Sequence, residues 1–285
     1  MLGFYFLIYA NGLIMIDFHC HSYFSDGLLS PEELLQQALN NGVTKLALTD
    51  HDTIAGLSRL HTAAYNKPIT VINGIEVSTR WAKYDLHIIG LQFDCANADL
   101  RALIERQTAT RITRAIAIGK RLTAIGVSDS YEKACLLAGH ERVGRPHFAQ
   151  VLVNEGFVSD IQQAFKKFLG HNRSAYVPIL WPSLEEVVAV IHAASGVAVI
   201  AHPLKYSLTR TVLNELIKNF KAIGGVGLEV VSGQIADHNV KLLAEYCVRY
   251  KLLASTGSDY HGDGLSYVGI GKQQALPESC AVICS

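Results

Sequence analysis

Short apolar runs alternate with helical patterns along most of this 285-residue chain. Lys45–Thr49 and Val197–Ala201 are typical of buried strands. Ser30-Pro31 has the form of a helix start, with an N-cap serine followed by proline. This β-α-β rhythm favours parallel strands with helices packed outside them. The same patterns predict strands at Met15–Phe18, Ile69–Ile72, Leu86–Phe93, Val226–Val231 and Leu252–Ser255, and helices at Ile54–Tyr65, Ser183–Ala194, Thr209–Ile223 and Ile235–Tyr250.

The rhythm breaks between residues 97 and 170. Basic residues such as Arg106 and Lys120 recur there at helical spacings, with leucine and isoleucine between them. We therefore predict a small all-helical insertion over residues 97–170, inside an α/β domain formed by residues 15–96 and 171–285. The length of the chain fits a single α/β barrel.

Residues 1–14 are apolar and contain no lysine or arginine. The segment is too short to span a bilayer, and a signal peptide would begin with basic residues. We interpret residues 1–14 as an N-terminal extension of the domain. A cleaved signal peptide is the alternative.

The charge balance limits the partners that the protein can bind. The chain has 25 basic and 25 acidic residues, so its net charge is zero. A protein that coats duplex DNA needs an excess of basic groups, and we therefore expect no stable duplex DNA binding. We also expect no membrane partner. The six cysteines form no C-x-x-C pair, and we expect reduced thiols in a cytoplasmic protein.

Histidine and acidic residues lie in or just after six of the predicted strands. They are His19, His21, Asp26, His51, Glu76, His87, His202, Asp259 and His261. Because the carboxyl ends of parallel strands meet at one end of the fold, we expect these side chains to form a single site. Residues i and i+2 of an extended chain face the same way, so His19 and His21 point together, as do Asp259 and His261.

This set of side chains has the chemistry of a metal site. Imidazole nitrogens and carboxylate oxygens without thiolates suit Mn, Zn or Fe ions. Nine candidates exceed the needs of one ion, so we predict two or three divalent ions that share a bridging carboxylate. Clustered ions clamp a phosphoryl group and activate a bridging water. Asp50 is interpreted as a carboxylate that orients a ligand histidine, whereas Asp52 is equally compatible with a helix cap.

The motifs H-x-H-S-x-x-S-D-G, T-D-H-D, G-I-E, H-I-I-G, A-H-P and G-S-D-Y-H occur in this order. Together they resemble the PHP (polymerase and histidinol phosphatase) family, with Ser22 where that family more often has threonine. The resemblance implies a distorted (β/α)7 TIM-like barrel with a trinuclear metal centre. It assigns His19, His21, Glu76 and Asp259 to one ion, Glu76 with His87 and His202 to a second, and Asp26, His51 and His261 to a third.

The end of the insertion, V-G-R-P-H-F at residues 143–148, narrows the resemblance. It is similar to the branch of the family that dephosphorylates nucleoside 3′,5′-bisphosphates, which includes enzymes that trim RNA from the 5′ end. In such a site Arg145 is expected to hold a phosphate through its guanidinium, with His147 beside it. Ser78 and Lys205 are further candidates for substrate binding, although Lys205 also fits a surface lysine.

The resemblance implies a phosphoric ester hydrolase that removes the 3′-phosphate of nucleoside 3′,5′-bisphosphates through a hydroxide bridging two ions. Short 5′-phosphorylated RNA is a second expected substrate class. Two alternatives remain. One is a histidinol-phosphate phosphatase, which the helical insertion disfavours. The other is a non-catalytic metal-binding accessory module, which the full ligand set disfavours.

Overall fold

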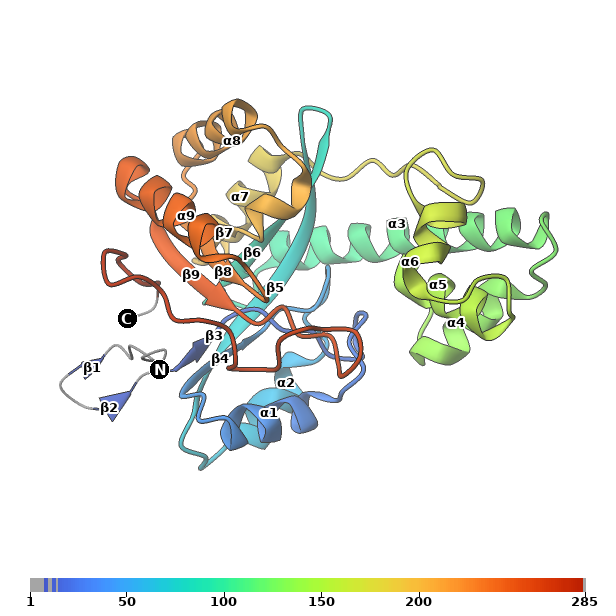
Figure 1. The fold of residues 1–285 in the computed structure, drawn as a ribbon. Coiled ribbons are helices and arrows are strands. Elements are labelled where there is room, and N and C mark those ends of the chain that lie inside the picture. The colour runs from blue at the N-terminus through green and yellow to red at the C-terminus, as the bar shows by residue number, and fades with distance from the viewer. Residues whose placement is uncertain (1–7, 10–11, 14, 284–285) are drawn as a thin grey trace.

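A computed structural model describes residues 8–9, 12–13 and 15–283 of the chain. Its centre is a nearly closed barrel of seven strands, which follow one another in the order of the sequence (Figure 1). They are β3 (Ile16–Asp17), β4 (Lys45–Leu48), β5 (Thr70–Trp81), β6 (Tyr84–Leu91), β7 (Val197–Ile200), β8 (Gly227–Ser232) and β9 (Leu253–Gly257). The predicted barrel-type α/β fold is confirmed.

The first and last strands of the barrel approach each other along a seam. The Phe18 N–H donates to the carbonyl of Thr256 at 3.0 Å. Gly257 lies so close to His19 that a Cβ at this glycine would be 2.3 Å from the His19 Cβ. Only glycine therefore allows β9 to pass the chain that follows β3.

The predicted N-terminal extension lies mostly outside the described residues. Within it, β1 (Ile8–Tyr9) and β2 (Gly12–Leu13) form a separate antiparallel pair.

The barrel differs from the prediction at β5 and β6. The prediction of parallel strands is wrong for β6, which is antiparallel to both β5 and β7. The prediction that the strand at Ile69 ends at Ile72 is also wrong, because β5 continues to Trp81 and pairs along its length with β6. Only two residues separate these strands. Such a turn joins antiparallel strands and leaves no room for a crossover helix.

Helices lie around the barrel (Figure 1). They are α1 (Pro31–Asn40), α2 (Leu57–Ala64), α7 (Leu184–Ala193), α8 (Arg210–Ala222) and α9 (Asp237–Tyr250), with a short 3-10 turn, η2 (Pro203–Tyr206), after β7. The predicted start of α1 is confirmed, because Ser30 and Glu33 form a reciprocal capping box. The helices bury their apolar faces against the strands, as α8 does with Leu216, Ile217 and Phe220.

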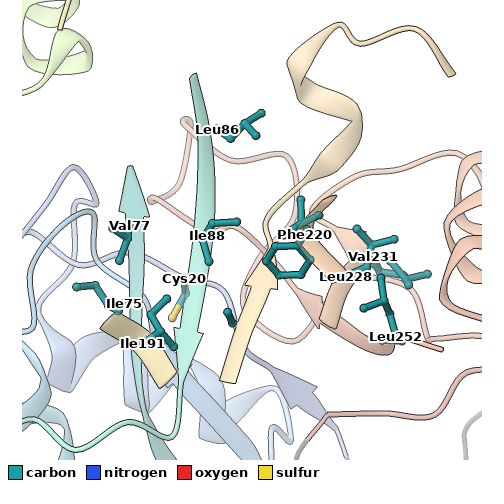
Figure 2. Packing of buried hydrophobic residues seen from close by; sticks show 14 of the residues in the cluster. Cys20, Ile75, Val77, Leu86, Ile88, Ile191, Phe220, Leu228, Val231 and Leu252 are labelled. Atoms are coloured by element: carbon teal, nitrogen blue, oxygen red, sulfur yellow. The ribbon is translucent and has the colours of Figure 1, made fainter. Parts of the chain in front are cut away.

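The main hydrophobic core lies between the strands and these helices. Figure 2 shows Ile75 and Val77 of β5 together with Ile88 of β6, all of which are fully or almost fully buried. The Cys20 side chain and Ile191 of α7 belong to the same cluster. This packing holds the ends of the strands in fixed positions, where the polar side chains described below are located.

The segment between β6 and α7 is largely helical. It contains α3 (Ala98–Thr123), α4 (Ser130–Ala138), α5 (Arg145–Asn154), α6 (Ile161–Ala164) and a π-helical turn, η1 (Phe165–Leu169). These elements have a hydrophobic cluster of their own, in which Ile118 and Leu122 of α3 pack with Phe148 and Leu152 of α5. The first turns of α3 instead join the barrel core through Leu100 and Leu103. One long helix therefore belongs to both cores (Figure 1).

In the part of the chain that the structure describes, no helix combines the length and the apolar character that crossing a membrane requires.

Candidate metal centre

All nine predicted ligands meet at one end of the barrel. His19 and His21 follow β3, Asp26 lies in the next loop, His51 follows β4, Glu76 is in β5, His87 is in β6, His202 follows β7, and Asp259 and His261 follow β9. They form four overlapping groups in which the potential ligand atoms lie within 4.8 Å of one another. The reversal of β6 explains the place of His87, because the start of an antiparallel strand meets the carboxyl ends of parallel ones.

Glu76 is the centre of the cluster. Its Oε1 lies 2.7 Å from His202 Nε2 and 2.9 Å from His87 Nδ1. Its Oε2 lies 3.0 Å from His51 Nδ1, 3.3 Å from His19 Nε2 and 3.4 Å from His21 Nε2. A carboxylate that faces five imidazoles through both oxygens has the position of a bridging ligand.

Two aspartates complete the arrangement on either side of His21. The Oδ1 of Asp259 lies 3.4 Å from His21 Nε2 and 3.5 Å from His19 Nε2. The carboxylate of Asp26 lies 3.4 Å from His261 Nε2 and 3.7 Å from His51 Nε2. The His21 and His261 rings are stacked, with their centroids 4.1 Å apart. The pairs at i and i+2 therefore do point into the same cluster.

The pKa values of two ligand histidines fit a cation site. Burial lowers the pKa of His21 to about 4 and that of His51 to about 3, so both rings are neutral near pH 7, as metal ligands must be. Burial also lowers the pKa of His261, but Asp26 and then Asp259 outweigh it and raise the value to about 9. For Glu76, burial favours the neutral form, yet His51, His87 and His19 hold its pKa well below the usual range.

Several buried polar atoms of the cluster lack a hydrogen-bond partner among the described residues. They are His19 Nε2, both ring nitrogens of His21, Asp26 Oδ1, His51 Nδ1, Glu76 Oε2 and His202 Nδ1. Buried polar atoms without partners are costly, and their convergence here indicates a missing common partner. Divalent ions with nitrogen and oxygen ligands fit these atoms.

Glu229 in β8 was not among the predicted residues. It is fully buried, and its Oε1 lies 2.9 Å from His19 Nδ1. Its Oε2 accepts a 2.6 Å hydrogen bond from the backbone N–H of His202. Glu229 thus orients one ring and fixes the backbone of a second ligand without facing Glu76. An acidic residue inside the apolar run Gly227–Ser232 was the signal that could have revealed it.

Asp50 acts on a loop rather than on a histidine ring. Its carboxylate accepts hydrogen bonds from the hydroxyls of Ser22 and Ser25, both at 2.6 Å, and from the Ser22 N–H at 2.8 Å. These bonds shape the turn that presents Asp26. Burial raises the pKa of Asp50 to about 6, against the effect of the two serines. The predicted contact with a ligand histidine is replaced by these bonds, and Glu229 has the orienting position instead.

The helix-cap interpretation of Asp52 is wrong. The helix α2 begins later, with Gly56 at its N-cap. The buried Asp52 carboxylate instead pairs with Arg111 of α3 at 2.6 Å and accepts the N–H of Ser78 at 2.7 Å. Arg111 also donates to the Ser78 hydroxyl at 3.0 Å. The buried Ser78, a predicted substrate ligand, therefore already has an arginine partner and helps to connect the barrel to α3.

Of the other predicted substrate residues, Lys205 contacts a predicted metal ligand, whereas the contacts of Arg145 and His147 are with the helical segment. Arg145 occupies the first position of α5, where its guanidinium lies over the Phe165 ring. His147 accepts the Gly144 N–H on Nδ1 at 3.0 Å. Lys205 pairs with the outer oxygen of Asp259.

Two further arginines, which the sequence did not single out, face the cluster. A small pocket is lined by Ser25, Asp26, His51, Arg111, Arg142 and Gly144. Arg142 is held by a 2.8 Å hydrogen bond from its guanidinium to the Phe24 carbonyl. The helical segment therefore contributes cationic side chains directly beside predicted metal ligands. Such an arrangement suits an anion that bridges the ions and the guanidinium groups.

The sequence and the fold are similar to those of known proteins. The PHP domain model matches residues 17–267. The sequence is 43% identical to a 5′-3′ exoribonuclease of Haemophilus influenzae, over 92% of this chain and 95% of the relative. It is 39% identical to a 3′,5′-nucleoside bisphosphate phosphatase of Chromobacterium violaceum, over 94% of each chain. The solved structure of an amidohydrolase from Chromobacterium violaceum with bound sulfate has a TM-score of 0.89 and 38% identity, over 94% of each chain. Family model, relatives and fold agree, and this chain belongs to the PHP domain family.

Proposed function

We propose that this protein is a metal-dependent phosphoesterase that hydrolyses the 3′-phosphate of nucleoside 3′,5′-bisphosphates, with short 5′-phosphorylated RNA as a second substrate class. The observation that carries the proposal is the buried cluster around Glu76, in which carboxylates and imidazoles converge at the end of the barrel. The relatives that act on bisphosphonucleotides and on RNA supply the substrate class.

The cluster has ligands for two or three divalent ions, for which Mn, Zn and Fe are the candidates. We assign His19, His21 and Asp259 to one ion and His87 with His202 to a second, and Glu76 faces both groups. Asp26, His51 and His261 form the third group. When bound, such ions supply an activated water and neutralise charge on the phosphoryl group.

The cationic side chains bind and orient the phosphates in this proposal. Arg142 and Arg111 line the pocket beside Asp26 and His51, and Lys205 reaches Asp259 from the other side. Burial, followed by repulsion from Arg145 and Arg111, lowers the pKa of Arg114 to about 10. A group of guanidinium ions crowded enough to repel one another is stabilised by a bound polyanion.

His147 has the protonation state needed to donate to a phosphate oxygen. Its Nδ1 accepts the N–H of Gly144, so the proton of the neutral ring lies on Nε2. Burial lowers the pKa of His147, which keeps the ring neutral at physiological pH. Together with Arg145 on the same helix turn, His147 would position the phosphate that is not cleaved.

The test is phosphate release from a panel of substrates by protein of known metal content. Adenosine 3′,5′-bisphosphate should release phosphate and yield the 5′-monophosphate, and a 5′-phosphorylated oligoribonucleotide should be shortened. Histidinol phosphate serves as the competing substrate. Faster release from histidinol phosphate would replace the proposed substrate class, and no hydrolysis by fully metal-loaded protein would favour the accessory-module alternative.

A further inference from the structure

A groove leads from the metal cluster across the end of the barrel. Its inner end contains three of the predicted metal ligands, Asp26, Asp259 and His261. Its outer end is formed by residues 265–268 of the loop after β9 and by the loop after β8, which contributes Gln234. A substrate held at the metals by one phosphate would extend its remaining atoms along this groove.

The loop after β9 is fixed to the metal ligands. The Ser266 hydroxyl accepts the backbone N–H of His261 at 2.7 Å and donates to the carbonyl of Asp259 at 3.4 Å. Asp263 accepts the phenolic hydroxyl of the buried Tyr260 at 2.9 Å. The residue next to Ser266 is therefore held at a defined position relative to the proposed reaction centre.

That next residue is Tyr267, whose side chain is 86% exposed at the rim of the groove. Leu265, 44% exposed, lies in the same loop and also lines the groove. An exposed aromatic ring on an anchored loop, beside a site for a phosphorylated nucleotide, is a surface on which a base can stack. An isolated exposed tyrosine needs no explanation, but this one adjoins a groove that ends at the ligand cluster.

We propose that Tyr267 is the platform for the nucleobase of the substrate, and that the groove from Asp26 to Tyr267 is the base-side half of the binding site. This inference rests on the proposed function. Stacking tolerates every base, because each has a π-face, and so it suits a protein whose relatives act on nucleotides and on RNA. The exposed Gln234 side chain offers an amide to the edge of the stacked base.

The experiment compares Tyr267→Ala, Tyr267→Phe and Tyr267→Trp with the parent protein. The substrates are adenosine 3′,5′-bisphosphate and the abasic 1,4-anhydroribitol 3,5-bisphosphate, which has both phosphates but no base. The matched control is Tyr65→Ala, since Tyr65 is 77% exposed but lies at the end of α2, outside the groove. The Kd of adenosine 5′-monophosphate, measured by calorimetry, is a readout that does not depend on turnover.

Tyr267→Ala should raise both the KM of the nucleotide and the Kd of the monophosphate roughly tenfold, because base–aromatic stacking is lost. The value of kcat should stay near that of the parent, since the contact is the same before and during reaction. Tyr267→Phe, Tyr267→Trp and Tyr65→Ala should behave like the parent, and the abasic substrate should not distinguish any variant. An equal loss with the abasic substrate, or an unchanged Kd in Tyr267→Ala, would overturn the inference.

The two proposals fail in different ways. If the parent protein binds adenosine 5′-monophosphate through Tyr267 but hydrolyses no phosphate ester, the base platform stands and the proposed activity falls. If it hydrolyses the nucleotide and the abasic substrate equally well and Tyr267→Ala changes neither, the activity stands and the platform falls. If it neither binds nor hydrolyses nucleotides, both are overturned.

Discussion

Glu229 contacts two of the predicted metal ligands by accepting one hydrogen bond from each. The variant Glu229→Gln tests how much these two hydrogen bonds contribute to metal affinity. When His19 binds an ion through Nε2, its Nδ1 carries the proton and donates to Glu229 Oε1, while the His202 N–H donates to Oε2. Glutamine has nearly the same shape but only one oxygen. Its NH2 group must therefore face one of the two donors, and the negative charge is lost.

The expected decrease in metal affinity follows from the hydrogen bond that is lost. A hydrogen bond to a charged group contributes about 1.5–3 kcal/mol. A loss of this size corresponds to a decrease of about 10- to 100-fold in metal affinity, the range typical when a partner of a ligand histidine is removed. The packing should be unaffected because the side-chain volume is kept.

The assay is a competition titration of the metal-free protein with Zn²⁺ or Mn²⁺ and a chelating indicator, with circular dichroism as the check on folding. The control is Glu245→Gln, because Glu245 is an exposed residue of α9, the helix that follows β8. Unchanged metal affinity in well-folded Glu229→Gln, equal to that of the control, would refute the idea that Glu229 supports the centre.

Three further predictions follow from the same structure. Dialysis against EDTA should abolish phosphate release, and adding Mn²⁺ or Zn²⁺ should restore it; full activity in the chelator would exclude a metal mechanism. Asp26→Ala should lower both the bound metal and the activity at least 100-fold with folding retained, because it removes a ligand facing His51 and His261. Arg111→Met should lower the free energy of unfolding in urea by about 3–5 kcal/mol, because it leaves buried Asp52 without its cation. Arg106→Met serves as the control, because Arg106 is exposed on the same helix, and it should lower the free energy of unfolding by less than about 1 kcal/mol. An equal effect in both variants would contradict the role given to the ion pair between Arg111 and Asp52.

The sequence predicted the elements that obey simple periodicity. The strands at Lys45 and Val197, the capped start of α1 and the helix α8 were each placed to within about two residues. Short patterns with strong local signals fix these elements. The ligand candidates were also brought together as expected, because the residues that follow parallel strands share one end of a barrel.

The direction of β6 could not be obtained in this way. Antiparallel and parallel neighbours have the same apolar pattern when both faces are buried. The turn between Trp81 and Tyr84 contains none of the glycine or asparagine residues that mark a tight hairpin, and Ala82 adopts a positive φ of 52° there. The local signal for the hairpin was therefore missing.

The supporting residues of the site were also not predictable from motifs. Asp52 and Arg111 are 59 positions apart in the sequence, and only the packing of α3 against the barrel brings them together. Glu229 differs from the predicted ligands because it contacts ligand residues rather than the cluster centre. Motif spacing identifies groups on one element, whereas such pairs depend on tertiary packing.

The seam between β3 and β9 has a consequence for how the protein assembles. Every other strand pair in the barrel joins neighbours in the strand order of the sequence, but the seam joins Asp17 to Ser258, 241 positions away. Such a closure has the largest loop entropy to overcome. His19 and Asp259 lie on opposite sides of this seam and face each other at 3.5 Å. Ions bound between them would favour the closed barrel by mass action, so we expect the supply of metal to affect folding as well as chemistry.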